Sequence, residues 1–243
     1  MQPYDEEMYK NRHKTTLSSA QEIVPLVLDL IQPSSVIDIG CGVGTWLSVF
    51  KELGVNHVFG VDGDWVDKSL LQIPEDCFMS FDLRNPMRLE KKFDLVVSLE
   101  VAEHFPEELS ENFVNILISL GPVILFSAAI PYQVGKIHLN EQWPDYWAKL
   151  FEKKGYLIVD CLRSKIWNNN NILYWYAQNM FIYAQEDYLS NNKLLKEEFS
   201  KNNNAQLSLV HPTLYTMYAK YLHHLWKIYL LLPSWVRRKF RRE

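Results

Sequence analysis

Three glycines spaced two residues apart, Gly40, Gly42 and Gly44, lie between a short apolar segment and a segment with helical periodicity. The helical segment stops at Gly54, a residue type that commonly follows a helix end, and a second apolar segment comes next. A strand, a glycine loop, a helix and a strand in this order form a βαβ unit, which requires a parallel sheet with a right-handed crossover. The first strand, the helix and the second strand are expected at residues 35–39, 45–53 and 57–61.

The alternation of apolar and helical segments continues to about residue 185. We therefore predict an α/β fold, a Rossmann-like doubly wound sheet of seven strands, with a C-terminal helical extension. Residues 1–185 would form the main domain, 186–210 a polar connector rich in Asn, Lys and Glu, and 211–243 a basic amphipathic helical extension. The other strands are expected at 77–81, 93–98, 123–127, 156–160 and 180–183, and further helices before residue 31, at 106–120 and at 144–154.

Composition and charge narrow the classes of function. Of the 243 residues, 48% are hydrophobic and 22% are charged, which excludes a wholly disordered chain. The net charge of −4 argues against a nucleic-acid partner, and the aromatic content of 14% suits flat ligands or ordinary core packing. Three unpaired cysteines, an N-terminus without an apolar stretch and the lack of an apolar run of about 18 residues predict a cytoplasmic protein.

The C-terminal extension carries aromatic residues followed by a basic cluster. Trp226, Tyr229 and Trp235 precede a segment in which five basic residues stand beside one acidic residue, Glu243. Such an end suits contact with the inner face of an anionic membrane or with a protein partner, and it equally suits a solvated tail on a packed helix. The basic residues are Arg237, Arg238, Lys239, Arg241 and Arg242.

The glycine loop and the acidic residue after the second strand indicate a nucleoside ligand. Glycines let the backbone approach a ligand closely, and the start of the following helix points its N–H groups at an anion. Asp62, at the end of the next strand, can accept both ribose hydroxyls; the alternative is that it caps a helix. The spacing G-x-G-x-G differs from the dinucleotide pattern G-x-G-x-x-G, which would place a glycine where Thr45 stands.

Four motifs at the ends of successive strands resemble those of class I S-adenosylmethionine-dependent methyltransferases. Residues 38–44 are similar to the D-x-G-x-G-x-G loop, and residues 62–65 to the acidic loop that borders ribose and adenine. Residues 81–83 match the position whose carboxylate receives the adenine amino group, and residues 93–104 resemble the fourth-strand motif of ubiquinone-type methyltransferases. The resemblance spans residues 9–184 and implies S-adenosylmethionine as the cofactor and S-adenosylhomocysteine as its product.

The resemblance also implies roles for individual residues. Gly40, Cys41 and Gly42 would line the methionine end of the cofactor, with its carboxylate near Gly44 and Trp46. The remaining assignments follow the strand ends. They are Asp38 within the first strand, Asp62 for the ribose hydroxyls, Gly63, Asp64 and Trp65 around the adenine, Asp82 for its amino group with Phe81 and Leu83 beside it, and Ser98, Leu99 and Glu100 beneath the sulfonium.

Two histidines are candidates for acid–base chemistry. Methyl transfer from a sulfonium is an in-line displacement, so the acceptor must be held on the methyl axis with water excluded. A hydroxyl acceptor must also lose its proton, and histidine is the usual base. His104 follows the fourth strand and His138 lies in the loop after the fifth, both at the sheet edge where such folds bind ligands. We expect His138, or else His104, to be the base; the alternative for His138 is a capped helix start.

The loop around His138 combines amides, a carboxylate and aromatic rings, which suits a hydroxyl-rich acceptor. It resembles a loop of bacterial methyltransferases from polysaccharide and secondary-metabolite pathways, although its aromatic residues suit core packing equally well. No convergent set of Asp and Asn oxygens for Mg²⁺ stands out, so no metal is expected. The residues expected to bind the acceptor are Tyr132, Gln133, Asn140, Glu141, Gln142 and Trp143.

The sequence therefore predicts a methyltransferase that uses S-adenosylmethionine and acts on oxygen in a small or sugar-containing acceptor. One alternative is transfer to nitrogen or carbon of another small metabolite, and another is a paralogue that binds the cofactor without catalysis. The spacing of the glycines argues against a nicotinamide-dependent dehydrogenase on the same fold.

Overall fold

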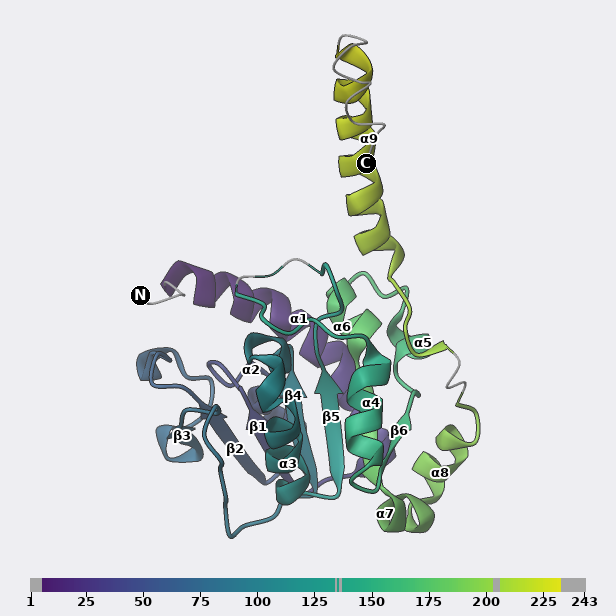
Figure 1. Cartoon of the computed structure of the whole chain (residues 1–243). Helices are drawn as coiled ribbons and strands as arrows, with labels where there is room; N and C mark the ends of the chain where they lie inside the picture. The colour runs from purple at the N-terminus through teal and green to yellow at the C-terminus, as the bar shows by residue number, and fades with distance from the viewer. Residues whose placement is uncertain (1–5, 134, 136, 203–205, 233–243) are drawn as a thin grey trace. The chain divides into compact units, whose positions relative to one another are not determined.

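The computed structural model describes residues 6–133, 135, 137–202 and 206–232, and its elements are labelled in Figure 1. The chain divides into two compact units, residues 1–209 and 210–243, and each is described by itself. The second unit contains α9 (Pro212–Leu231). The helices and strands of the first unit are α1 (Glu6–Ile31), β1 (Ser35–Ile39), α2 (Thr45–Glu52), β2 (His57–Asp62), β3 (Phe78–Ser80), β4 (Leu95–Leu99), a 3₁₀ turn (Ala102–His104), α3 (Ser110–Leu120), β5 (Val123–Ser127), α4 (Pro144–Glu152), β6 (Tyr156–Val159), α5 (Arg163–Ile166), α6 (Tyr174–Asn179), β7 (Phe181–Gln185), α7 (Glu186–Asn191) and α8 (Lys193–Phe199).

Seven strands form one sheet in the order β3-β2-β1-β4-β5-β7-β6 (Figure 1). β7 runs antiparallel to both of its neighbours, whereas the other pairs are parallel. α2 connects β1 to β2 and α3 connects β4 to β5, as parallel neighbours require. The strand order reverses between β1 and β4, and such a switch point is where open α/β sheets bind ligands. The predicted seven-stranded α/β fold is confirmed.

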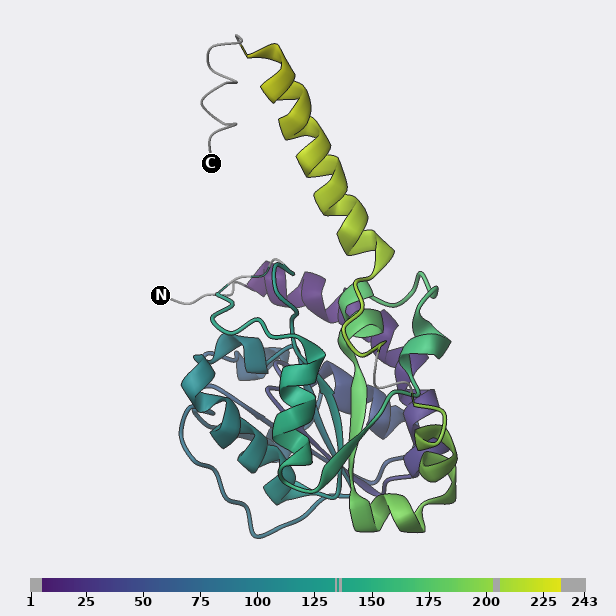
Figure 2. The same cartoon turned by 45° about the vertical axis from the view of Figure 1, so that its right-hand side comes forward.

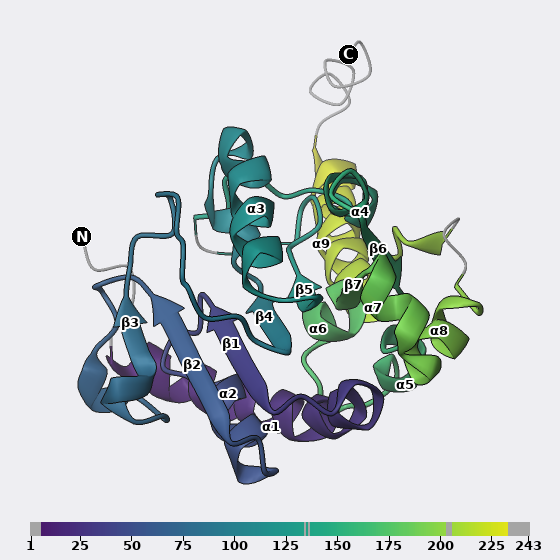
Figure 3. The ribbon, with the colours of Figure 1, turned by 90° about the horizontal axis from the view of Figure 1, so that it is seen from below.

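Helices cover both faces of the sheet, with α1 and α2 on one face and α3 and α4 on the other (Figure 3). Successive residues of a strand point to opposite faces, so each central strand contributes to two cores. In β5, Val123 and Leu125 belong to the core beside α1 and α2, whereas Ile124 and Phe126 belong to the core beside α3 and α4. Burial on both faces explains why these strands read as continuous apolar runs in the sequence.

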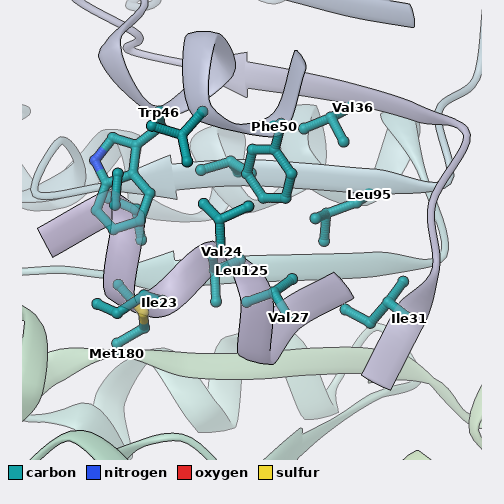
Figure 4. Packing of buried hydrophobic residues seen from close by; sticks show 14 of the residues in the cluster. Ile23, Val24, Val27, Ile31, Val36, Trp46, Phe50, Leu95, Leu125 and Met180 are labelled. Carbon is teal, nitrogen blue, oxygen red and sulfur yellow. The ribbon is translucent and has the colours of Figure 1, made fainter. Parts of the chain in front are cut away.

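α1 packs against the sheet through a stripe of aliphatic side chains at helical spacing. Ile23, Val24 and Val27 are fully buried and lie beside Leu125 of β5 and Phe50 of α2 in Figure 4. Burying each such side chain contributes about 1.5–3 kcal/mol relative to an exposed one. The N-terminal helix is therefore an integral layer of the fold that also runs past the glycine loop.

The polar segment after β7 differs from the expected connector, because residues 186–202 are largely helical and belong to the first unit. Leu189 of α7 and Leu195 of α8 are buried, and α8 lies beside α1 in Figure 2. The side chain of Asn192 accepts a hydrogen bond from the backbone N–H of Leu195 (3.0 Å) and donates one to the backbone oxygen of Leu30 (3.3 Å). The polar residues are the exposed faces of two short helices, each of which buries one leucine and packs a partly buried aromatic residue, Tyr188 or Phe199, against the core.

The second unit consists of α9 among the described residues, and the basic residues at 237–242 of the predicted extension lie outside them. His211 caps α9, since its Nδ1 accepts a hydrogen bond from the backbone N–H of Thr213 (3.2 Å). None of the described helices combines the length and apolar character that crossing a membrane requires.

Candidate active site

The loop between β1 and α2 is held in a backbone conformation that glycine adopts readily. Gly40, Gly42 and Gly44 have φ angles of 85°, 54° and 82°. The N–H of Gly40 donates to the backbone oxygen of Val61 (2.8 Å), which ties the loop to β2. A Cβ atom on Gly40 would lie 2.4 Å from Cγ2 of Val101, whereas one on Gly42 would meet no atom within 4 Å. The loop is therefore tightly packed at Gly40 and open at Gly42.

Asp62, at the end of β2, joins this loop to the next one. Its Oδ2 accepts a hydrogen bond from the backbone N–H of Gly42 and its Oδ1 from that of Gly63, both at 2.7 Å. The side chain is buried, and these two donors offset the cost of removing its charge from water. A carboxylate offers more lone pairs than two bonds use, so Asp62 can also accept hydroxyl groups. The chain continues from Asp62 as a turn, so the alternative role of a helix cap does not apply.

A cavity of about 430 Å³ opens beside the glycine loop at the carboxyl ends of the central strands. Its volume lies within the range of about 300–1,000 Å³ that is typical of small-molecule sites. Its wall combines exposed glycine backbone, buried carboxyl groups and aromatic rings, which fits a nucleoside with a polar extension. The wall includes many of the residues expected to bind the cofactor, namely Asp38, Gly40, Cys41, Gly42, Trp46, Asp62, Trp65, Asp82, Leu83, Leu99 and Glu100, together with His104.

Five of the expected cofactor residues lie outside the cavity wall in the described part of the chain. Two of them support it: Gly63 donates to Asp62, and the hydroxyl of Ser98 donates to the backbone oxygen of Ile39 (2.9 Å). Gly63 and Ser98 would therefore affect a ligand only by holding neighbouring residues of the wall in place. The five are Gly44, Gly63, Asp64, Phe81 and Ser98.

The cavity wall also contains residues that were not expected to bind the cofactor. His13 of α1 lies with its Nδ1 2.8 Å from Oγ1 of Thr45, so α1 closes one side of the glycine loop. Arg84 donates to both carboxylate oxygens of Asp82, with its Nε 2.8 Å from Oδ1 and its Nη2 2.7 Å from Oδ2. Tyr176 of α6 joins the wall from a segment far along the chain. Only the tertiary fold brings His13 and Tyr176 to the loop. No local pattern indicates His13, whereas Tyr176 belongs to an aromatic-rich segment, residues 167–179, whose composition suits either a cover for the acceptor or an exposed loop.

The carboxyl groups at the cavity have different electrostatic environments. Burial raises the pKa of Asp38 well above its ordinary value, and the negative charge of Asp62 raises it further. Burial also raises the pKa of the Cys41 thiol, so this cysteine remains protonated. Hydrogen bonds from Arg84 lower the pKa of the exposed Asp82 carboxyl. Asp82 is thus held as an anion at the cavity mouth, while Asp38 resists ionisation beneath the loop.

A second part of the site is formed where the loop after β5 meets the 3₁₀ turn after β4. The backbone N–H groups of Leu139 and Asn140 donate to the backbone oxygen of Glu103, at 2.8 and 3.1 Å. Nδ1 of His104 lies 3.1 Å from the backbone oxygen of Ile137. These three bonds fasten the loop to the turn next to the cavity, whose wall includes His104 and Ile137.

The fastened loop brings the two candidate bases together. The ring centroids of His104 and His138 are 5.1 Å apart, with an angle of 80° between the rings. Nδ1 of His138 lies 2.7 Å from Oε1 of Glu141, and these side chains are 12% and 22% exposed. The buried Glu103 and both histidines offer ligand atoms that all lie within 4.8 Å of one another. The sequence did not indicate this cluster, because its members come from two separate loops.

Behind the histidines, a buried network of side-chain amides surrounds Glu100. Gln133 and Asn179 donate to its carboxylate, at 2.7 and 3.2 Å, and Gln178 donates to the side-chain oxygen of Gln133 at 3.2 Å. Burial raises the pKa of Glu100, and the hydrogen bonds from Asn179 and Gln133 oppose this rise. Glu100 has a φ of 57°, a left-handed conformation that is uncommon outside glycine. Such strain persists only where the surroundings fix the residue, so the network holds Glu100 rigidly.

The residues expected to bind the acceptor divide into exposed and internal ones. Tyr132 is 80% and Trp143 is 40% exposed, so both present aromatic surface beside the loop. Asn140 is buried, and its amide donates to Oγ of Ser110 (2.8 Å) and accepts from Gln142 (2.9 Å). The amides of Asn140 and Gln142, like that of Gln133, are thus engaged in shaping the loop.

Comparisons with known proteins agree with this geometry. A family model described as a methyltransferase domain matches residues 11–153, and no curated protein sequence matches the chain. Magnesium protoporphyrin IX methyltransferase from Synechocystis PCC 6803, solved with bound S-adenosylhomocysteine, is 21% identical, with a TM-score of 0.52 over 72% of this chain and 84% of that chain. CalS10 from Micromonospora echinaspora, an amino pentose methyltransferase solved with S-adenosylmethionine, is 15% identical, with a TM-score of 0.56 over 75% of this chain and 98% of that chain. DesVI from Streptomyces venezuelae is 17% identical, with a TM-score of 0.53 over 73% and 94% of the two chains.

Proposed function

Because this chain belongs to the methyltransferase domain family, we propose that it methylates a hydroxyl group of a small, sugar-containing acceptor. The family match covers more than half of the chain, and the chain is a class I S-adenosylmethionine-dependent methyltransferase. The choice of oxygen as the accepting atom and of a sugar as the acceptor is our own inference from the loop between β5 and α4.

The observation that carries the choice of oxygen is the pair formed by His138 and Glu141. An ionised carboxylate only accepts hydrogen bonds, so Nδ1 of His138 carries the hydrogen of the 2.7 Å bond to Glu141. Nε2 of the neutral ring is then the lone-pair nitrogen that can take a proton. A carboxylate that orients a histidine and stabilises its charged form is also how serine hydrolases activate a hydroxyl. An amine acceptor would need this help less.

In this proposal, the active site has two halves. The cofactor half, around the glycine loop and Asp62, positions the cofactor, and the acceptor half, around the loop between β5 and α4, removes a proton from the acceptor. S-adenosylmethionine, when bound, supplies the methyl group, whose carbon–sulfur bond breaks as the carbon–oxygen bond forms. Asp62 and the open backbone at Gly42 fix the ribose and the methionine end, and Glu100 and His104 form other parts of the same cavity wall. Nε2 of His138 takes the proton of the acceptor hydroxyl. Alignment of this kind contributes up to about 7–11 kcal/mol in intramolecular analogues.

The sugar character of the acceptor rests on the surface that the loop presents. Trp143 and Tyr132 expose aromatic surface next to the polar His138–Glu141 pair, a combination that suits the apolar face and the hydroxyl edge of a sugar ring. The description of CalS10 as an amino pentose methyltransferase supports this class of acceptor.

Turnover with a panel of acceptors tests the proposal. S-adenosylmethionine with a labelled methyl group is incubated with the protein and nucleotide sugars, glycan fragments, phenols or amines, and we expect the label on a sugar hydroxyl. His138→Gln should lower kcat by about 10²–10⁴ while S-adenosylhomocysteine still binds. The matched control is His57→Gln, at an exposed position where β2 begins. Label found only on amines, or full turnover by His138→Gln, would contradict the proposal.

We also propose that the C-terminal helix binds an anionic membrane surface. α9 contains no Asp or Glu, carries Lys220 and Lys227, and stacks the rings of Trp226 and Tyr229 with their centroids 5.2 Å apart. Aromatic and basic residues on one helix favour the interface between lipid headgroups and acyl chains. The basic residues at 237–242 would add about 1 kcal/mol each near an anionic surface.

Co-sedimentation with vesicles tests this contact on the full chain. We expect binding to vesicles of phosphatidylcholine with phosphatidylglycerol and little binding to phosphatidylcholine alone. Lys220→Glu with Lys227→Glu should release the protein, whereas Lys14→Glu with Lys153→Glu, the same charge change outside α9, should not. Equal sedimentation of both double variants would exclude α9 as the contact.

A further inference from the structure

The cluster of Glu103, His104 and His138 contains more than a proton acceptor needs. One histidine and one orienting carboxylate suffice to take a proton from a hydroxyl. Here a second imidazole and a second carboxylate converge on the same point, with one ligand atom from each of the three residues within 4.8 Å of the others. Convergence of three such groups from two loops is the arrangement that holds a metal ion.

Both histidines are oriented through the same ring atom. The backbone oxygen of Ile137 and the carboxylate of Glu141 can only accept, so Nδ1 of His104 and Nδ1 of His138 each carry a hydrogen. Nε2 is therefore the lone-pair nitrogen in both rings. Metal-binding histidines are oriented in this manner, by a carbonyl or a carboxylate on the other ring nitrogen.

The third group of the cluster adds a buried negative charge. The side chain of Glu103 is 1% exposed, and removing a carboxylate from water is unfavourable unless positive charge or donors accompany it. A buried carboxylate is also a strong ligand for a cation, because little water competes for it or screens its charge. Two imidazoles and one carboxylate suit divalent transition metals, whereas Mg²⁺ and Ca²⁺ prefer oxygen ligands alone.

We infer that Glu103, His104 and His138 bind one divalent transition-metal ion, such as Zn²⁺ or Mn²⁺, on the acceptor side of the cavity. Methyltransferases of this class need no metal, so the ion is a property of this chain's acceptor half. Its positive charge lowers the pKa of a nearby acceptor hydroxyl. In the metal-bound protein Nε2 of His138 is a ligand and the proton of the hydroxyl passes to solvent, whereas in the metal-free protein Nε2 of His138 takes that proton as proposed above. This catalytic consequence rests on the proposed function, but the binding site does not.

Calorimetric titration of the metal alone tests the site without cofactor or acceptor. Metal-stripped full-length protein is titrated with Zn²⁺ and with Mn²⁺, in a background of His223→Ala and His224→Ala that removes the adjacent histidines of α9. We expect one ion per chain. Glu103→Gln, His104→Ala and His138→Ala should each weaken binding by at least about 100-fold, and Glu141→Gln, which only orients His138, by about 10–100-fold. His57→Ala, an exposed histidine outside the cluster, should leave binding unchanged.

A further variant keeps all three ligands but displaces one of them. A Cβ atom at Gly135 would lie 1.8 Å from Nε2 of His138, so Gly135→Ala should move that ring and weaken metal binding. Thermal unfolding and binding of S-adenosylhomocysteine report whether each variant still folds. The inference is overturned if no ion binds, or if the cluster variants bind the ion as tightly as the background protein. Failure to bind metal, together with slow turnover by His138→Gln, would leave the proposed proton transfer intact.

Discussion

The two halves of the active site are built in different ways. In the cofactor half, Asp62 engages two backbone N–H groups while Gly42 leaves open space beside the cavity. In the acceptor half, the side-chain amides of Gln133, Asn140 and Asn179 are engaged with other side chains of the protein. The first half offers backbone and the carboxylates of Asp62 and Asp82 to a ligand, and the second offers a rigid scaffold with a few exposed groups on it.

Because of this difference, substitutions in the two halves should have different effects. Substitutions in the cofactor half should mainly change ligand affinity, because its polar groups line the cavity. Substitutions in the buried amide network should mainly change stability, because an unpaired buried polar group costs about 1–3 kcal/mol. Substitutions of the exposed groups of the acceptor half, in contrast, should change acceptor binding with little effect on stability.

The largest effect is expected from Asp62→Ala in the cofactor half. The variant loses two charge-assisted hydrogen bonds to the loop and the acceptor for the ribose hydroxyls, so binding of S-adenosylhomocysteine should weaken by about 100-fold or more. Calorimetry measures the change, with the exposed Asp76→Ala as the matched control. An unchanged affinity in Asp62→Ala would show that the cofactor half does not bind its ligand through this carboxylate.

The next prediction distinguishes the loss of space for a ligand, which lowers affinity, from backbone strain, which lowers stability. Gly42→Ala and Gly54→Ala both add a Cβ to a left-handed residue with no neighbouring atom within 4 Å, so each should cost roughly 1 kcal/mol of stability. Only Gly42 lines the cavity, so only Gly42→Ala should weaken S-adenosylhomocysteine binding, by about 10-fold or more. Thermal unfolding and calorimetry measure the two quantities. Equal affinities of both variants would show that the open space at Gly42 is not used by the cofactor.

Gln133→Leu probes the amide network in the acceptor half. It removes the donor to Glu100 and the acceptor for Asn179, so we expect a loss of about 2 kcal/mol, or about 4–8 °C in the unfolding temperature. The same substitution at the exposed Gln72 should change the unfolding temperature little. A similar stability of both variants would mean that the acceptor half is not held by this network.

The smallest effect concerns the free energy of unfolding as a function of pH. The contributions of Asp38 and Asp82 to stability should change in opposite directions as the pH rises. The folded-state pKa of Asp38 is raised by burial and by Asp62, so the stability it contributes is present at low pH and is lost as the pH rises through that pKa. The pKa of Asp82 is lowered by Arg84, so its contribution is present above the ordinary pKa and is lost as the pH falls.

Unfolding temperatures of the ligand-free protein between acidic and neutral pH check this pair. Relative to wild type, Asp38→Asn should become more stable as the pH rises. Asp82→Asn should become slightly less stable over the same range, and the change is small because Asp82 is exposed and its ion pair is screened. The same sign for both variants would contradict the assigned environments.

The fold around the cofactor half could be predicted because its sequence signals are local, whereas the ligand contacts of its residues stay a prediction. The spacing of Gly40, Gly42 and Gly44 and the acidic end of β2 lie within one βαβ unit, so their order in the chain determines their position in space. The alternation of elements also predicted a sheet of seven strands, but it did not predict the place of β7 between β5 and β6. Ser98 and Gly63 were expected at the ligand but support the wall from behind, since a strand-end motif does not say which side chain faces the cavity.

The acceptor half was harder to predict because it depends on contacts between distant segments. Glu103 and His138 meet only through the bonds between the loop after β5 and the turn after β4, and Gln178 and Asn179 reach Glu100 and Gln133 from α6. His13 reaches the glycine loop only because α1 packs across the sheet. The polar composition of residues 186–202 concealed two helices, because each of them buries only one leucine.

Calorimetric titration of the wild-type chain with S-adenosylhomocysteine, beside a parallel titration with NADH, shows which cofactor the cavity binds. We expect one saturable site per chain for S-adenosylhomocysteine and no heat of binding for NADH. Saturable binding of NADH without binding of S-adenosylhomocysteine would contradict this expectation.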